Sequence, residues 1–175
     1  LPLQAGSDHI LKLMNRHYNL QEFKDLIHTL RSRIEGLAIT TDIIAGFPGE
    51  TDEDFEDTMN TVRELGFTHI HAFPYSIREG TPAATMENQV PEAVKKTRVA
   101  LLNSLGQEGL TKFAQSLIGK EAHILVEREV DGYYLGFTNE YIHGKIKKGA
   151  TDYPVGSIIG GTVTAFDGES LIIES

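Results

Sequence analysis

Three short segments carry side chains suited to binding a small polar ligand, and each of them follows a predicted strand. They are Gln4-Ala5-Gly6-Ser7, Gly46-Phe47-Pro48-Gly49-Glu50-Thr51, and the run from Tyr75 to Thr81. Glycines at a strand end let the backbone approach a ligand closely, and the helix that follows offers free N–H groups. The arginine, tyrosine and hydroxyl groups of the third segment suit a ligand with carboxylate and ribose groups. We therefore expect a ligand mouth where these strand ends meet, as at the top of α/β barrels.

Two further clusters allow a metal-site interpretation. His69 and His71 are two residues apart on a predicted strand, so their side chains share a face, as metal ligands on a barrel strand do. Ordinary strand alternation explains this pair equally well, and no third ligand is evident. The acidic run from Glu50 to Asp57 complements a helix dipole, which predicts a solvated helix face, with a hard-cation site as the alternative.

The first two thirds of the chain show alternating helix and strand patterns. Asn19 to Glu22 and Thr51 to Asp54 are capping boxes that predict helix starts, and Gly36 and Gly66 are natural stops. The pattern predicts helices over 7–16, 19–34, 51–65 and 91–117 and strands over 39–47 and 69–75, with Gly106 and Gly109 as candidate kinks in the last helix. Short loops between these elements favour parallel strands joined by crossover helices. The strand at 39–47 is apolar on both faces around Ile43-Ile44-Ala45, as a buried parallel strand should be.

The remainder of the chain has a different pattern, which places a domain boundary at 118/119. Short runs of alternating apolar and polar residues predict five strands, at 123–126, 133–137, 141–146, 157–166 and 171–173. Asp131-Gly132 and Asp167-Gly168 are turn signals between them. Five strands in this length favour a small antiparallel β-barrel of the OB kind over residues 119–175.

One predicted barrel strand carries a candidate RNA-binding face. Alternation places Tyr141, His143, Lys145 and Lys147 on the same side, and basic groups interleaved with an aromatic suit phosphates and bases. The alternative is an ordinary barrel strand with a solvated lysine face. Residues 119–175 contain nine acidic residues and five lysines or arginines, a balance that does not favour RNA overall.

Composition excludes several classes of protein. The 175 residues have a net charge of −9 and no cysteine, so the chain has neither a disulfide framework nor a thiolate metal site of its own. The negative charge argues against non-specific nucleic-acid binding. No apolar run is long enough for a membrane span and no signal peptide is visible, which leaves the cytoplasm as the default location.

The motifs together resemble a known family. Leu3-Gln4-Ala5-Gly6-Ser7 with Met14-Asn15-Arg16, then the run from Asp42 to Thr51, then the run from Phe73 to Ala83, resemble the radical SAM methylthiotransferases (MiaB-like enzymes) over essentially the whole chain. The wording Tyr75-Ser76-Ile77-Arg78-Glu79-Gly80-Thr81 looks most like the branch that acts on N6-threonylcarbamoyladenosine beside the tRNA anticodon. Residues 119–175 look like the TRAM domain that ends these proteins and is credited with RNA binding.

The resemblance implies a fold, cofactors and partners. Residues 1–118 would be the C-terminal part of a partial, TIM-like radical SAM β/α barrel with a long linking helix, followed by the TRAM barrel. A 4Fe-4S cluster would cleave S-adenosylmethionine reductively, the resulting radical would abstract hydrogen from the adenine, and a second cluster would help to supply sulfur. The tRNA anticodon stem-loop would be the substrate. By this analogy the S-adenosylmethionine site would be lined by Gln4, Ser7, Arg16, Ile44, Gly46, Tyr75 and Arg78, with Arg16 or Ser7 meeting the carboxylate and Ile44 packing on adenine.

The chain also departs from the family pattern. The Cys-x3-Cys-x2-Cys cluster loop is absent, and the chain begins at Leu1 in what looks like the end of a strand. We therefore expect a fragment of a transferase that needs a missing N-terminal half, supplies no cluster ligand itself, and is inactive alone. The alternatives are action on isopentenyladenosine, a non-catalytic RNA-binding module with a degenerate half barrel, and a metal-dependent hydrolase using His69 and His71. The sequence leaves the modified adenosine and the oligomeric state open.

Overall fold

The computed structural model describes all residues from 1 to 175 and shows two compact units, Leu1–Gly109 and Leu110–Ser175. The long helix α4 (Glu92–Ser116) contributes residues to both units. None of the helices combines the length and apolar character that crossing a membrane requires. The two units are described separately below.

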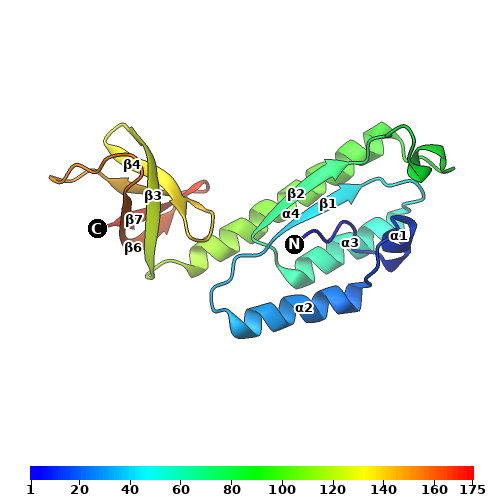
Figure 1. Ribbon diagram of the computed structural model, residues 1–175, viewed down its shortest axis with the longest axis horizontal. Helices are drawn as coiled ribbons and strands as arrows, with labels where there is room; N and C mark the ends of the chain where they lie inside the picture. The colour runs from blue at the N-terminus through cyan, green and yellow to red at the C-terminus, as the bar shows by residue number, and fades with distance from the viewer. The chain divides into compact units, whose positions relative to one another are not determined.

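A small parallel sheet lies at the centre of the first unit. Strand β1 (Thr40–Ala45) pairs in parallel with β2 (His69–Pro74), and an isolated parallel bridge joins Gln4 to Ile43 on the other side of β1. Figure 1 shows the two strands running side by side with their arrowheads in the same direction. The predicted parallel α/β architecture is therefore confirmed.

Local capping signals set the helix starts. Helix α1 (Asp8–Leu13) has Ser7 as its N-cap, and α2 (Leu20–Arg33) and α3 (Asp52–Leu65) begin with complete capping boxes at Asn19 and Thr51. Helix α3 ends at Gly66, whose φ of 57° is the left-handed conformation that glycine adopts without strain. A single 3-10 turn, η1 (Pro82–Thr85), follows β2. These starts agree with the sequence prediction because each depends on residues within a few positions of one another.

The helices pack against one face of the sheet. Its core unites side chains of α2, α3 and α4 with alternate residues of the strands: Phe23, Ile27, Ile43, Ala45, Phe55, Met59, Val62, Leu65, Ile70 and Leu102. The other face of β1 carries Thr40, Asp42 and Ile44, which are only half-buried. The expectation that this strand is buried on both faces is wrong, because helices cover only one face of β1.

Helix α4 runs unbroken through both glycines that were candidate kinks. A Cβ at Gly109 would lie 2.1 Å from the carbonyl oxygen of Phe67, and one at Gly106 would lie 3.3 Å from Cβ of Ile70. Both glycines therefore serve close approach of the helix to the loop and strand beneath it, a packing role that leaves the helix axis continuous.

The second unit is a closed five-stranded barrel in the order β3-β4-β5-β7-β6. Its strands are β3 (Glu121–Val130), β4 (Tyr133–Thr138), β5 (His143–Lys147), β6 (Ile158–Phe166) and β7 (Ser170–Glu174). All neighbouring pairs are antiparallel except β5 and β7, which are parallel. Asp131 and Gly132 both have positive φ, as the predicted two-residue turn between β3 and β4 requires. The small barrel after a partial α/β region confirms the predicted fold class.

Candidate ligand mouth at the strand ends

The three predicted ligand-binding segments converge in the first unit. One apolar cluster joins Ala5 from the first segment, Phe47 from the second and Tyr75 from the third, with Ile10 and Leu11 of α1 beneath them. The carboxyl ends of neighbouring parallel strands lie at the same edge of a sheet, and ligands of open α/β folds bind there. The convergence that the sequence predicts is therefore present.

Gln4 and Arg16 form a polar pair at this edge. Arg16 Nη2 donates to Oε1 of Gln4 over 2.6 Å, and Gln4 has a left-handed φ of 69°. The backbone of Gln4 is fixed by hydrogen bonds to β1, from its N–H to the carbonyl of Asp42 and from the N–H of Ile44 to its carbonyl. The guanidinium is exposed and has donors to spare, so it is available to a carboxylate.

Ser7 lies in a buried network around Asp54. Its hydroxyl donates to Oδ1 of Asp54 over 2.6 Å, and His9 Nδ1 lies 3.1 Å from both carboxylate oxygens. The N–H and hydroxyl of Thr51 donate to Oδ2. Burial alone would raise the pKa of Asp54, but hydrogen bonds from Ser7, Thr51 and His9 outweigh burial and lower its pKa to about 2. In this arrangement the Ser7 hydroxyl is committed to fixing α1 against α3.

The Gly46 turn is held by a buried acid. The N–H of Gly46 donates to Oε2 of Glu50 over 2.6 Å, and Arg98 Nη1 donates to the same oxygen over 2.5 Å. Glu50 is 6 % exposed and Arg98 is 5 % exposed. Burial raises the pKa of Glu50, and the hydrogen bond from Gly46 and the charge of Arg98 offset only part of that rise. Gly46 itself needs to be glycine, because its φ is 75° and a Cβ would lie 2.4 Å from Cγ of Lys95.

Tyr75 completes the mouth with a buried ring. It packs edge-on against Phe47 with ring centroids 5.2 Å apart, and Lys95 Nζ lies 5.3 Å from the ring centroid on its face. Lys95 is 2 % exposed, and its ammonium group is paired with Glu92. The Tyr75 hydroxyl is buried and has no hydrogen-bond partner in the structure. A buried hydroxyl without a partner is uncommon and requires an explanation at this position.

The other two residues assigned to the mouth are more open. Ile44 is half-buried on the face of β1 that the helices leave uncovered, where it stands opposite Phe73 of β2. Arg78 is exposed after β2, and only its backbone carbonyl is engaged, by the N–H and hydroxyl of Thr81. Both side chains are thus available to a ligand, one for packing and the other for an anion.

Lys95, Arg98 and Asp54 are site residues that sequence reasoning missed. Asp54 and Glu50 were assigned to a solvated acidic face, which is wrong for these two because both are buried. The sequence did contain a signal for the two cations, because Lys95 and Arg98 are three residues apart on a predicted helix and therefore share a face. The acid that Arg98 binds, Glu50, is 48 residues away in sequence, so the spacing of the two cations alone did not identify their roles.

The mouth fits S-adenosylmethionine in part, whereas the chain offers nothing for an iron–sulfur cluster. A ligand with polar and carboxylate groups would suit this mouth for three reasons. The Tyr75 hydroxyl has no hydrogen-bond partner, Arg16 has unused donors, and Gly46 lets the backbone approach closely. Iron–sulfur clusters are held mainly by cysteine thiolates, and no cysteine occurs among the 175 residues. We therefore assign no part of a cluster site to this chain.

Three of the four residues for which RNA binding was predicted lie on β5, and Tyr141 precedes the strand. His143 and Lys147 are exposed on β5, Lys145 is half-buried, and the buried residues Gly144 and Ile146 alternate with them. Tyr141 lies just before the strand in a left-handed turn with φ of 59°, and it is 83 % exposed. The ring of Phe137, which the sequence analysis did not single out, packs 4.1 Å from His143 and 5.9 Å from Tyr141 between centroids. Lys145 pairs with Asp167 over 2.5 Å, which leaves Lys147 as the unpaired cation of this face.

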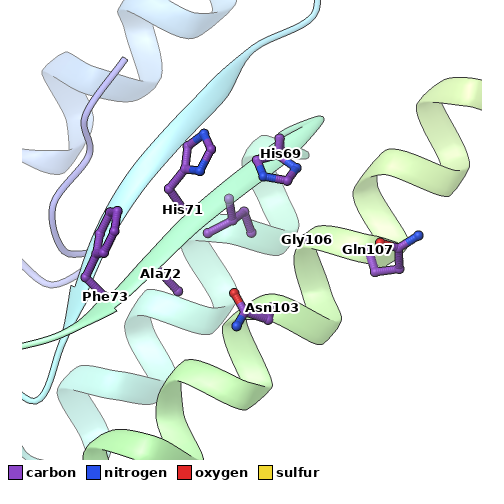
Figure 2. A pocket seen from close by; sticks show the side chains of 8 residues that line it. His69, His71, Ala72, Phe73, Asn103, Gly106 and Gln107 are labelled. Carbon is purple, nitrogen blue, oxygen red and sulfur yellow. The ribbon is translucent and has the colours of Figure 1, made fainter. Parts of the chain in front are cut away.

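His69 and His71 do share a face of β2, as predicted, with ring centroids 4.5 Å apart (Figure 2). No group of three or more His, Asp or Glu side chains in the structure is arranged to hold a metal ion. The pair therefore lacks the third ligand that a hydrolase of this kind would need.

Comparison with models of protein families gives a match in the first part of the chain. The family model described as the radical SAM superfamily matches residues 1–62, which include the first two ligand-binding segments. The match shows that this stretch is similar to the radical SAM superfamily.

Comparison with individual proteins identifies relatives that are named as tRNA-modifying enzymes. The chain is 49 % identical over 133 residues to tRNA-2-methylthio-N(6)-dimethylallyladenosine synthase of Caldicellulosiruptor saccharolyticus, a match covering 76 % of this chain and 27 % of that protein. The corresponding synthase of Pelotomaculum thermopropionicum is 49 % identical over 131 residues, covering 75 % of this chain and 29 % of that protein. Threonylcarbamoyladenosine tRNA methylthiotransferase MtaB of Bacillus subtilis is 38 % identical over 164 residues. This match covers 91 % of this chain and 36 % of that protein. The resemblance to the radical SAM tRNA methylthiotransferase family is confirmed, and the matched part spans about a third or less of these relatives.

Proposed function

We propose that this chain is the part of a tRNA methylthiotransferase that contributes one side of the S-adenosylmethionine site and the tRNA-binding barrel. The observation that carries the proposal is the meeting of three strand ends, where the Gln4–Arg16 pair marks the first and Phe47 packs against Tyr75 of the other two. The first 62 residues, which hold two of these strand ends, match the radical SAM superfamily. The cysteine-bearing N-terminal half of the same protein would be its partner, the tRNA anticodon stem-loop its substrate, and the cytoplasm its location.

Specific residues would hold the cofactor. Arg16 would donate to its carboxylate, Ile44 would pack on its adenine, and Gly46 would allow the backbone to approach. Bound S-adenosylmethionine supplies the hydrogen-abstracting species and the methyl group, and this chain's own residues bind and orient it. Ser7, Glu50 and Arg98 would fix the loops from behind, and Arg78 would neutralise negative charge at the rim.

We propose N6-threonylcarbamoyladenosine as the modified nucleoside, on the Tyr75–Thr81 motif and on the longer match to the Bacillus subtilis relative. The higher identity of the two dimethylallyladenosine synthases favours isopentenyladenosine as the second candidate. Expression of the chain joined to its cysteine-bearing half, in cells that lack methylthiolated tRNA, tests both. Mass spectrometry of tRNA nucleosides would show a methylthio group on the threonylcarbamoyl nucleoside; its appearance on the isopentenyl nucleoside would select the second candidate, and its absence from both would refute the proposed activity.

A non-catalytic RNA-binding module is the remaining alternative. The same cells distinguish it, because a module would bind a stem-loop through the barrel without any change in tRNA nucleosides. Replacement of Arg16 by Ala in the joined protein is the matched control, since it should abolish methylthiolation while leaving stem-loop binding intact.

A further inference from the structure

A hollow of about 360 Å³ opens on the outer surface of the barrel, and it shares only Lys145 with the sites described above. Its lining residues are Val130, Asp131, Tyr133, Leu135, Lys145 and Ile172. In the strand register, Tyr133 of β4 stands opposite Val130 of β3. Lys145 of β5 stands opposite Leu135 of β4 on one side and Ile172 of β7 on the other. The residues that alternate with these along β4 and β5 are buried, so the walls of the hollow come from one face of the sheet.

The walls of the hollow are mainly apolar. Val130 and Tyr133 are 43 % and 37 % exposed, which is high for large apolar side chains. Asp131 is the one acid among the lining residues, and the ammonium group of Lys145 is paired with Asp167. A phosphate inside the hollow would therefore meet a carboxylate and a lysine that is already paired. A flat heterocycle would instead meet the Tyr133 ring and aliphatic side chains, which suit it.

Two exposed cations stand on the strands that flank the Tyr133 strand. Lys147 of β5 is directly opposite Tyr133, and Arg128 of β3 is directly opposite Leu135. Opposite residues of neighbouring strands are close enough for long side chains to reach across the same patch of surface. The nearest acid in sequence to Arg128 on the same strand that is ion-paired is Glu129, whose carboxylate is held by Lys148. One cation on each side of an apolar hollow suits the phosphates on either side of a base in a nucleotide strand.

We propose that this hollow binds one unpaired RNA base, which stacks on Tyr133. Arg128 and Lys147 bind the phosphates on either side of that base. Aromatic side chains stack on the splayed bases of single-stranded RNA, whereas the bases of a duplex are already stacked on one another. The assignment to RNA rests on the proposed function and deepens it. It adds Tyr133 and Arg128 to the RNA-binding face and names a single-stranded segment as the part of the RNA that the barrel binds.

Titration of the 175-residue chain, labelled with fluorotyrosine, with a short oligoadenylate tests the proposal. The fluorine resonance of Tyr133 is assigned by its absence from the spectrum of Tyr133→Phe. We expect this resonance to shift saturably with oligoadenylate. An abasic strand with the same number of phosphates should bind more weakly and leave the resonance unchanged, because it has no base to stack on the ring.

Variants of the chain separate the ring from the charges. Tyr133→Leu keeps an apolar side chain but removes the ring, and it should weaken oligoadenylate binding by about tenfold, the loss expected for one stacked base. Tyr133→Phe keeps the ring and should bind as the natural chain does. Arg128→Gln should weaken binding of oligoadenylate and of the abasic strand equally, as the loss of a phosphate contact does. Ile158→Ala is the matched control, because Ile158 is an exposed apolar residue of the barrel outside the hollow lining.

Two results would overturn the proposal: equal affinity of Tyr133→Leu and Ile158→Ala for oligoadenylate, or equal affinity of the natural chain for oligoadenylate and the abasic strand. Stem-loop binding measured on the same samples separates this inference from the proposed function. Either of those results with normal stem-loop binding would remove the base site and leave the proposed function intact. Oligoadenylate binding that depends on the Tyr133 ring, without stem-loop binding, would support the base site and remove tRNA as the source of the base.

Discussion

Asp54 is a single residue whose ionisation fixes the start of two helices. Its pKa of about 2 lies below the ordinary value of 3.8, so its contribution to stability is complete above about pH 4 and is lost as the pH falls toward 2. The shift corresponds to on the order of 2 kcal/mol. We expect Asp54→Asn to unfold more easily than the natural chain at pH 6, with the difference shrinking steadily between pH 4 and 2.

Urea denaturation across this pH range measures the effect. Asp57→Asn is the matched control, since Asp57 is exposed on the same helix and should alter stability little at any pH. A difference between the natural chain and Asp54→Asn that stays constant with pH would contradict the role given to the ionised carboxylate.

Replacement of Arg98 should strongly lower the stability of the first unit. Its removal would leave Glu50 buried without its cation, and breaking a buried pair in this way costs about 3–5 kcal/mol. We expect Arg98→Met to destabilise the first unit by about 3 kcal/mol. The double variant Glu50→Gln with Arg98→Met should recover much of the loss, because no uncompensated charge remains. Hydrogen exchange at β1 amides checks both, and an equally unstable double variant would show that packing of Arg98 on Phe55, rather than charge, matters there.

At the scale of elements, α4 depends on glycine where it touches the rest of the first unit. Ala normally stabilises a helix interior by about 1 kcal/mol relative to Gly. Gly109→Ala should instead destabilise by about 1–3 kcal/mol, because its Cβ would meet the Phe67 carbonyl oxygen. Gly106→Ala, with a longer approach of 3.3 Å to Ile70, should cost less. Thermal unfolding of the two variants tests this order, and a stabilised Gly109→Ala would contradict the close approach.

The same helix shows why the sequence predicts some elements better than others. The capping boxes at Asn19 and Thr51 and the turn at Asp131-Gly132 depend on residues within a few positions, so pattern reading placed them correctly. Gly109 and Arg98 act on groups 42 and 48 residues away in the sequence, and no local pattern identifies those partners. The mouth was predictable as a meeting of strand ends, whereas the buried acids and cations that hold its loops needed the tertiary structure.

In the barrel, one lysine should dominate RNA binding. Lys145 is engaged by Asp167, while Lys147 is exposed, has no ion-pair partner and stands opposite Tyr133 in the strand register. Lys147→Glu should therefore weaken stem-loop binding more than Lys145→Glu does. It should also reduce the slope of log affinity against log salt by roughly 0.7–0.9, the value for one phosphate contact. Fluorescence anisotropy at several salt concentrations measures both quantities, and unchanged affinity of both variants at low salt would refute this face as the RNA-binding one.

For the molecule as a whole, charge and composition together limit what this chain does by itself. A net charge of −9 leaves no general attraction for RNA, so the proposed RNA binding would have to arise from the local face that carries Lys147. In the proposed function the mouth binds S-adenosylmethionine, whereas cluster chemistry needs thiolates that these residues do not supply. The proposed function therefore assigns recognition and orientation to this chain.

Because these 175 residues include no thiolate for a cluster, we predict that the chain alone has no methylthiotransferase activity. Anaerobic reconstitution with iron and sulfide should leave only substoichiometric iron and no 4Fe-4S absorbance, and incubation with S-adenosylmethionine, a reductant and tRNA should produce no methylthiolated nucleoside. The joined protein bearing the cysteine half, treated identically, is the positive control and should gain both the absorbance and the product. A stoichiometric, redox-active cluster on the cysteine-free chain would require ligands other than thiolates and would overturn the proposal that the cluster is held outside these residues.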